Sequence, residues 1–270
     1  MKRFMVIVAA CALAPVLLNA GDEGSVDRLR VSLGDPSRPA RLNVGCINGR
    51  IVVHGANIRD MGVEAKGGAG PRRHGPERAE GLRRLESATP GLSIDQNDNE
   101  ITVSTHSVMT NADLSIEVPV NTSVKLKTVM GDIEVDGISG DLEVESTNGR
   151  MTLTNVSGAA LVHGVNGTIV ANFTRIPADK PMSFSSLNGD IDLTLPADVH
   201  ARLKMKTTNG DAYSDFDIAL QPQTIVDEKD GDRNHRHMTV EHAVTGVING
   251  GGPEIQLVTF NGNIKIRKRK

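Results

Sequence analysis

Evenly spaced glycines are the feature that most constrains the fold of this chain. Five of them recur every nine residues: Gly131, Gly140, Gly149, Gly158 and Gly167. The residues two and four positions after each glycine are apolar: Ile133 and Val135, Leu142 and Val144, Met151 and Leu153, Ala160 and Val162, Ile169 and Ala171. This alternation indicates half-buried strands of about four or five residues, and the glycines indicate turns between them. The segment therefore predicts a structural repeat.

Looser copies of the unit contain Asn-Gly pairs at Gly49, Gly189, Gly210 and Gly262. Alternate glycines are 18 residues apart from Gly131 to Gly167, then 22 to Gly189 and 21 to Gly210. These spacings suit coils of about 20 residues that stack about 4.8 Å apart and close a shared core. We therefore expect an all-β fold, a right-handed β-solenoid (single-stranded β-helix-like) of short strands with Gly/Asn turns. Antiparallel hairpins are the alternative, because Asn-Gly also favours two-residue hairpin turns.

The flanking segments fit the same fold, with two exceptions. Strands are expected at 92–94, 101–103, 114–118 and 124–126, with a polar hairpin turn over 95–100. Residues 66–85 are rich in glycine and then in arginine, which predicts a basic surface insertion. Residues 227–237 predict a charged loop.

The first residues have the pattern of an export signal. Lys2 and Arg3 precede an apolar run over 4–18, and Ala20 offers a small residue for cleavage. We therefore expect a signal peptide over 1–20 and a single β-solenoid domain over 21–270. The apolar run is shorter than the roughly 20 residues that span a bilayer. An alternative is lipid anchoring through Cys11, and either route places the protein in the periplasm or at the cell surface.

Composition weakens or excludes several classes of function. The chain has five Phe, one Tyr and no Trp, so it offers few of the aromatic platforms on which single-stranded nucleic acid stacks. The net charge of −3 is not that of a general polyanion binder, and no nucleic-acid partner is expected. With the leader removed, Cys46 has no cysteine to pair with. The apolar alternation around Cys46 predicts a core residue rather than a nucleophile.

The order of the motifs along the chain resembles a known family. The Gly-Asp-Ile-Glu-Val type units from Gly131, the segments 116–119 and 188–196, and the closing segment 250–266 resemble the bacterial putative-adhesin domains of unknown function called Toastrack. The resemblance covers about residues 30–268. It implies a β-solenoid in the bacterial envelope and carries over no catalytic residue.

Two carboxylates offer a catalytic hypothesis. Stacking of successive coils would place Asp190 and Asp211 about 5 Å apart, a separation that suits glycoside hydrolysis. The alternative is that polar residues after a turn glycine cap the turn, and Arg150 and Thr168 occupy equivalent places. We favour the second interpretation and expect no catalytic residues.

The best metal candidates lie in one charged segment. They are His235, His237 and His242, with Asp232 and Glu241. Imidazole suits zinc or nickel, but this spacing matches no recognised motif, so a solvated loop is favoured and no metal or cofactor is expected.

Together these features predict an exported, non-enzymatic cell-envelope module with a binding, adhesin-like or scaffold role. The alternative is a cryptic carbohydrate-active enzyme that uses the stacked aspartates. The expected partner is an envelope protein or a surface polymer. An exposed apolar patch on a sheet would favour binding, a featureless polar face a scaffold, and a cleft with paired acids an enzyme.

The basic C-terminus allows two interpretations. Its cations, Lys265, Arg267, Lys268, Arg269 and Lys270, would contact anionic surfaces, or they would protect an exposed edge strand over 263–267 from aggregation.

Overall fold

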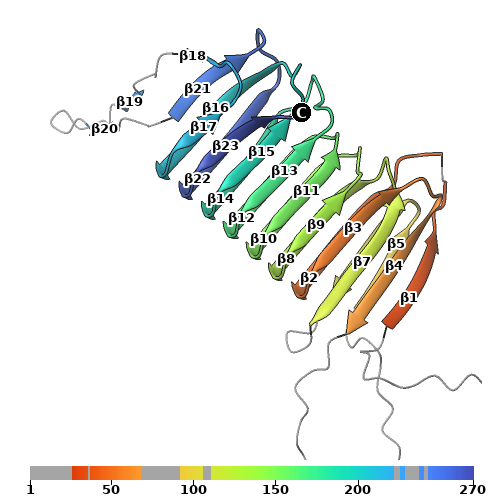
Figure 1. The fold of residues 1–270 in the computed structure, drawn as a ribbon. Helices are drawn as coiled ribbons and strands as arrows, with labels where there is room; N and C mark the ends of the chain where they lie inside the picture. Colours follow the sequence, from red (N-terminus) through yellow and green to blue (C-terminus); the bar gives the residue numbers. More distant parts are fainter. Residues whose placement is uncertain are drawn as a thin grey trace, which may run out of the picture.

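The computed structural model describes residues 26–35, 37–67, 92–105, 111–221, 226–228, 237–239 and 243–270. All regular elements in these ranges are β-strands, and no described helix is long and apolar enough to cross a membrane. The strands form two large sheets that lie back to back (Figure 1). Two short strands, β19 (Val226–Glu228) and β20 (His237–Thr239), form a separate antiparallel pair. The expected all-β solenoid is confirmed.

Each sheet has a continuous strand order. Sheet A runs β1 (Val26–Ser32), β4 (Asp60–Gly67), β7 (Ala112–Pro119), β3 (Ile51–Ala56), β9 (Ile133–Asp136), β11 (Met151–Val156), β13 (Ile169–Phe173), β15 (Ile191–Leu195), β23 (Ile264–Lys268), β17 (Ala212–Ser214). Sheet B runs β18 (Ala219–Gln221), β21 (Ala243–Ile248), β16 (Ala201–Asn209), β22 (Glu254–Asn261), β14 (Met182–Asn188), β12 (Ala160–Asn166), β10 (Leu142–Asn148), β8 (Ser123–Met130), β2 (Arg41–Asn48), β6 (Glu100–Thr105), β5 (Leu92–Asn97).

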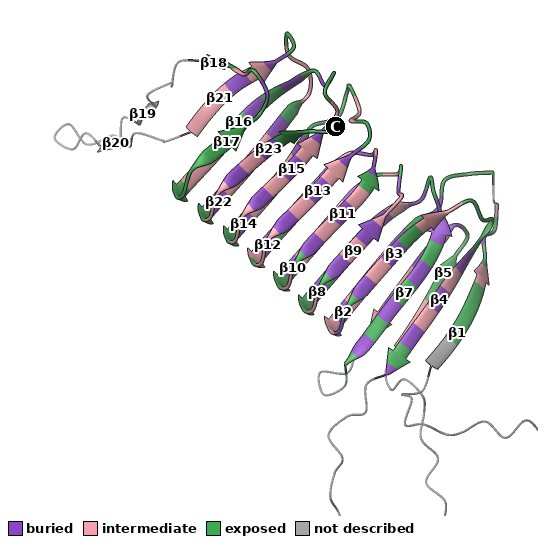
Figure 2. Ribbon diagram, in the orientation of Figure 1, coloured by how far each residue is buried: buried purple, intermediate pink, exposed green. Residues whose placement is uncertain are grey.

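Each coil, or rung, contributes one strand to each sheet. In the middle of the molecule the rungs β8/β9, β10/β11, β12/β13 and β14/β15 stack in chain order and pair in parallel. All ten apolar positions that follow the five glycines are buried between the sheets (Figure 2), and Val144 and Leu153 are both 0% exposed. The predicted register is therefore confirmed, and parallel pairing rules out the hairpin alternative for these rungs.

Antiparallel pairs occur at the two ends of the described solenoid. Strands β1, β4 and β7 pair in this way at one end, and β16, β21 and β18 at the other. Strands β5 and β6 form the hairpin that was expected over 95–100. At the second end Phe216 is buried and Ile218 packs against the core, which closes that end with apolar side chains.

The C-terminal rung departs from chain order. Strand β22 lies between β14 and β16, and β23 lies between β15 and β17. The interval from Gly189 to Gly210 therefore does not join neighbouring rungs, as the spacing had suggested. The interpretation of residues 263–267 as an exposed edge strand is wrong, because β23 has a hydrogen-bonded neighbour on each side.

One corner of the solenoid explains the Asn-Gly pairs. Gly149 and Gly167 have φ of +154°, and a Cβ atom on either would collide with the carbonyl oxygen of the corresponding glycine one rung earlier. The preceding asparagines form a side-chain ladder in the order Asn148, Asn166, Asn188, Asn261 and Asn209, with N···O distances of 2.7–2.8 Å. The turn motif thus acts between rungs as well as within one.

Cys46 lies at the same corner, with its side chain in the interior. Its register partner on β8 is Thr128, whose partner on β10 is Ser146. Farther along the same row of inward-facing residues, Ser186 donates a hydrogen bond to a turn glycine carbonyl. Cys46 is 4% exposed, and burial raises the pKa of its thiol. The prediction of a core cysteine is confirmed.

Candidate functional site

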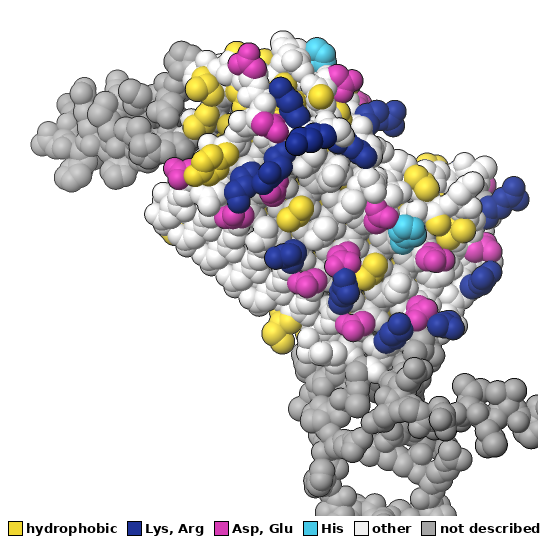
Figure 3. Space-filling model, viewed as in Figure 1, with side chains coloured by type: hydrophobic (Ala, Val, Ile, Leu, Met, Phe, Trp, Pro, Cys, Tyr) yellow, Lys and Arg dark blue, Asp and Glu magenta, His cyan; other side chains and the backbone are white. Residues whose placement is uncertain are grey.

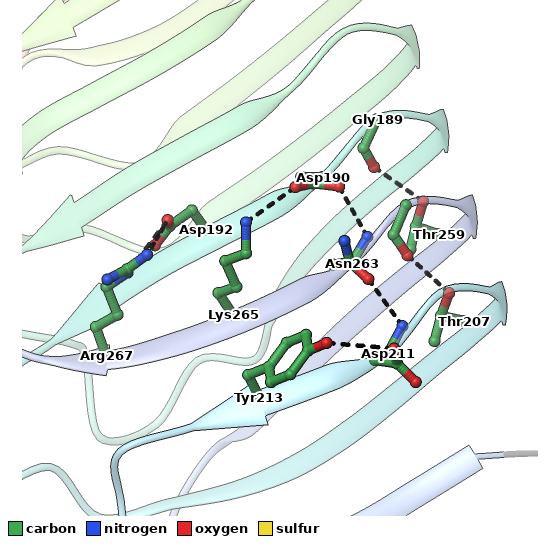
Figure 4. A network of polar contacts seen from close by, with 11 residues as sticks. Gly189, Asp190, Asp192, Thr207, Asp211, Tyr213, Thr259, Asn263, Lys265 and Arg267 are labelled. Carbon is green, nitrogen blue, oxygen red and sulfur yellow. Dashed lines mark hydrogen bonds and ion pairs between the residues drawn. The ribbon is translucent and has the colours of Figure 1, made fainter.

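The two carboxylates of the catalytic hypothesis are not neighbours. Asn263 of the C-terminal rung lies between Asp190 and Asp211 (Figure 4). Asp190 accepts a hydrogen bond from the Asn263 backbone N–H at 2.8 Å, and the Asn263 side-chain oxygen accepts one from the Asp211 N–H at 2.9 Å. Two strand spacings separate the carboxylates by about 10 Å. The expected pairing at about 5 Å is wrong because the chain inserts its last rung between the two.

Asp190 has a structural role. Hydrogen bonds from the Asn263 backbone and from the Lys265 ammonium, the latter at 3.0 Å, hold the pKa of Asp190 below its ordinary value. Its carboxylate is therefore ionised at neutral pH and is not a proton donor. Asp132 likewise accepts from the Arg150 N–H at 2.7 Å. The capping interpretation is supported, with one correction: the bonded N–H belongs to the neighbouring rung.

The basic C-terminus is partly neutralised. Lys265 pairs with Asp190, and Arg267 makes a two-pronged contact with Asp192 at 2.9 and 3.0 Å. The Lys268 ammonium lies 5.2 Å from the centre of the Phe216 ring. Contact of this terminus with anionic surfaces stays a prediction, and Lys268, Arg269 and Lys270 carry most of the charge left for it.

Several predicted features lie outside the described residues. These are the signal peptide over 1–20, Cys11, positions 68–85 of the basic insertion, and Asp232, His235, Glu241 and His242. Only the backbone of His237 is described, in β20, so the segment expected as a charged loop begins and ends in short strands. Among the described residues, no group of three or more His, Cys, Asp or Glu side chains could hold a metal ion.

The outer face of sheet B carries a broad groove. It has a volume of about 1070 Å³ and crosses the first halves of the strands from β6 to β22. One row of its lining residues lies in register, one residue to a strand: Asn43, Lys125, Glu143, Leu161, Ser183 and Gln256. Lys125 pairs with Glu143 at 2.8 Å, so charges of opposite sign meet in the floor of the groove.

An exposed apolar row runs beside the groove, near the ends of the same strands. We call Ile47, Val129, Val165, Leu187 and Phe260 the apolar row. Val129 is 43% exposed, and Leu187 and Phe260 are each 47% exposed. Thr147 interrupts the row on β10. Sequence reasoning missed this surface, although each of its members stands two positions before a turn glycine.

Sheet A presents a different outer face. Side chains of both charges are interspersed on it (Figure 3). Many form ion pairs between strands, among them Arg50 with Glu134 and His54 with Asp136. The large exposed apolar residues described on its strands, Leu29 and Tyr213, lie on its first and last strands. Of the two described faces, sheet B therefore offers the longer apolar row, which Thr147 interrupts once.

Comparison with known proteins identifies the family. The family described as Toastrack DUF4097 matches residues 86–267, which is more than half of the chain. This chain belongs to the Toastrack DUF4097 family.

Two solved structures resemble the Toastrack chain. A "putative cell adhesion protein" from Clostridium sporogenes is 11% identical, with a TM-score of 0.50, and the match covers 90% of this chain and 100% of that one. A "putative adhesin" from Bacteroides fragilis is also 11% identical, covers 90% and 97% of the two chains, and has a TM-score of 0.32. At this identity the first likeness supports the fold alone. No curated protein matches the sequence.

The Toastrack solenoid thus combines an apolar row and a charged groove on one rigid sheet. Such a surface can hold an extended partner, because the row supplies apolar contact area and the neighbouring groove supplies a polar rim. The parallel ladders beneath position both features without any loop.

Proposed function

We propose that this chain is an exported, non-enzymatic binding module of the bacterial cell envelope and that the outer face of sheet B is its binding surface. The apolar row is the observation that carries the proposal. Soluble proteins rarely gather several large apolar side chains in one exposed row unless the row meets a partner. The fold is shared with a protein described as a "putative cell adhesion protein", and the proposal extends an adhesin-like role to this chain.

The shape of the row indicates an elongated partner. From Val129 on β8 to Phe260 on β22 the row crosses four strand spacings, which is about 19 Å. The ion pair of Lys127 with Glu145, at 2.8 Å, lies beside the row and adds polar contacts. An envelope protein segment or a surface polymer laid along the solenoid axis would meet both. A passive scaffold would not need this face, and the separation of Asp190 from Asp211 removes the basis of the carbohydrate-active alternative.

Site-specific crosslinking tests the surface. A photoreactive residue at position 187 is compared with one at position 154, on the outer face of sheet A, in cells that produce the full chain. We expect a discrete crosslinked envelope component at position 187 and none at position 154. The double variant Leu187→Asp, Phe260→Asp should reduce retention of the protein on envelope fractions about tenfold, whereas Thr152→Asp, Thr154→Asp should not. Equal crosslinking at both positions would contradict the proposal.

Export is tested separately by the intact mass of the mature protein. A chain that begins at Gly21 supports the signal peptide, and a chain that begins at an acylated Cys11 supports a lipoprotein.

A further inference from the structure

A second concave surface lies at the C-terminal end of sheet A, away from sheet B. Its volume is about 450 Å³, within the range of small-ligand pockets. The lining comes from β17, from β23, from the residue after β17 and from the residue before β23: Tyr213, Ser214, Asp215, Asn263, Lys265 and Arg267, with Ile266 between the last two. We call this surface the Tyr213 notch. It lies where sheet A ends, because β17 is the last strand of that sheet.

A hydrogen bond from the hydroxyl group orients the Tyr213 ring, and much of the ring is exposed to solvent. Tyr213 is 54% exposed, and its hydroxyl donates to the Asp211 carboxylate at 3.2 Å. Lys265 stands opposite Tyr213 in the register, but its ammonium reaches the other way, to Asp190 just before the start of β15 (Figure 4). The ring therefore forms an aromatic wall of the notch.

The cations that line the notch are each bound to a carboxylate. Lys265 pairs with Asp190, and Arg267 pairs with Asp192. Asp215 accepts a hydrogen bond from the Lys268 backbone N–H at 2.6 Å. Among its described residues, the notch therefore offers no free cation that would select an anion. It retains hydrogen-bonding capacity, because a carboxylate has about four acceptor sites and the Asn263 amide has two donors.

We propose that the Tyr213 notch binds a neutral saccharide. The apolar C–H face of a pyranose ring packs on the Tyr213 ring, and its hydroxyl groups bond to the Asp215 carboxylate and the Asn263 amide, which both line the notch. This binding is non-catalytic, since Asp211 and Asp190 are too far apart to act as a pair. The site is independent of the binding surface proposed on sheet B, and either can fail without the other.

The composition of the chain allows binding in the notch to be followed by tyrosine fluorescence. Tyr213 is the only tyrosine and there is no tryptophan, so the intrinsic tyrosine emission of the full chain reports on this notch alone. The probes are maltotriose, cellotriose and the trimer of N-acetylglucosamine, titrated to millimolar concentration. We expect a saturable change in emission with at least one trimer, and calorimetric heat with one-to-one stoichiometry for the same trimer. Absence of heat from all three would overturn the proposal.

Variants separate the notch from a general surface effect. Tyr213→Ala should weaken binding about tenfold by calorimetry, whereas Tyr213→Phe keeps the ring and most of the affinity. Phe260→Ala removes an aromatic ring of similar exposure from sheet B and should leave the affinity unchanged. Thermal unfolding checks that each variant is folded. Loss of binding in Phe260→Ala but not in Tyr213→Ala would overturn the assignment, and stronger binding of a galacturonic acid trimer would overturn the neutral class.

Discussion

The middle of the solenoid and its C-terminal end use the same local motif but stack it differently. From β8 to β15 each rung lies beside the rung that precedes it in the chain. At the C-terminal end the chain builds β16/β17 first, adds β21, and then returns to insert β22/β23. Asn188, Asn261 and Asn209 are nevertheless in perfect register. The motif therefore determines the shape of a rung and not its place in the stack.

Charge explains why the last rung takes the inner place. If β17 lay beside β15 in the same register, Asp211 would meet Asp190, and Asp192 would face Tyr213 rather than a cation. Directly opposed like charges destabilise a sheet. With β23 in between, Asn263 and Lys265 bind Asp190, and Arg267 binds Asp192. On the other side of β23, the register with β17 places Arg267 next to Asp215. Each exposed pair contributes little, but the alternative order replaces attraction with repulsion.

The largest effect should come from removing the last rung. Truncation after Pro253 removes β22 and β23, which are the parallel neighbours of β16 and β17. We expect amide protons of residues 201–214 to lose protection from hydrogen exchange, because β16 keeps only its antiparallel neighbour β21 and β17 loses its described ladder partner.

The middle rungs serve as the internal reference for this truncation. Amide protons of β10 and β12 should keep their protection. If residues 201–214 also stayed protected, stacking in simple chain order would account for the data and the inserted rung would be refuted.

The turn glycines should respond equally in the two regions. Gly149→Ala and Gly262→Ala each place a Cβ against a glycine carbonyl of the neighbouring rung, at φ of +154°. We expect each to lower the free energy of unfolding by about 3 kcal/mol, measured by urea denaturation.

Gly45→Ala is the matched control, because nothing lies within 4 Å of the Cβ it would add. It should change stability by less than about 0.5 kcal/mol. A mild effect at Gly262 with a severe one at Gly149 would show that the last rung is packed more loosely than the middle.

The smallest effect concerns acid stability. Hydrogen bonds from the Asn263 backbone and Lys265 lower the pKa of Asp190, and Lys127 lowers that of Glu145 in the middle rungs. A carboxyl with a lowered folded pKa contributes stability above its unfolded pKa, near 4, and that contribution is lost as pH falls through the folded pKa.

Asp190→Asn and Glu145→Gln should each remove part of this dependence, by less than about 1 kcal/mol. The contribution of Glu145 should fall more with added salt, since its main partner is an exposed ammonium, whereas that of Asp190 depends first on a backbone N–H. Unfolding measured from pH 3 to pH 7 at two salt concentrations tests this, and equal salt sensitivity would contradict it.

Much of the fold was predictable because its determinants are local. Alternation around Val144 and Leu153 predicted the buried face, the polar run over 95–100 predicted a hairpin, and the context of Cys46 predicted a core position. The glycine spacing predicted that Asp190 and Asp211 lie on adjacent rungs. That prediction was wrong, because it assumed that neighbours in the chain are also neighbours in the stack. The apolar row was detectable in principle, because its members recur two positions before the turn glycines, but only the parallel register shows that they form one line.

The sequence by itself determined the strands, the turns and the inward side chains, because glycine conformation and the burial of alternate apolar residues act over a few positions. The tertiary structure decided which rungs are neighbours. The rungs share the same glycine and apolar positions, and most of them share the asparagine. The choice among them therefore depends on contacts between residues as distant as Asp190 and Lys265, and on the buried Phe216 at the end of the stack.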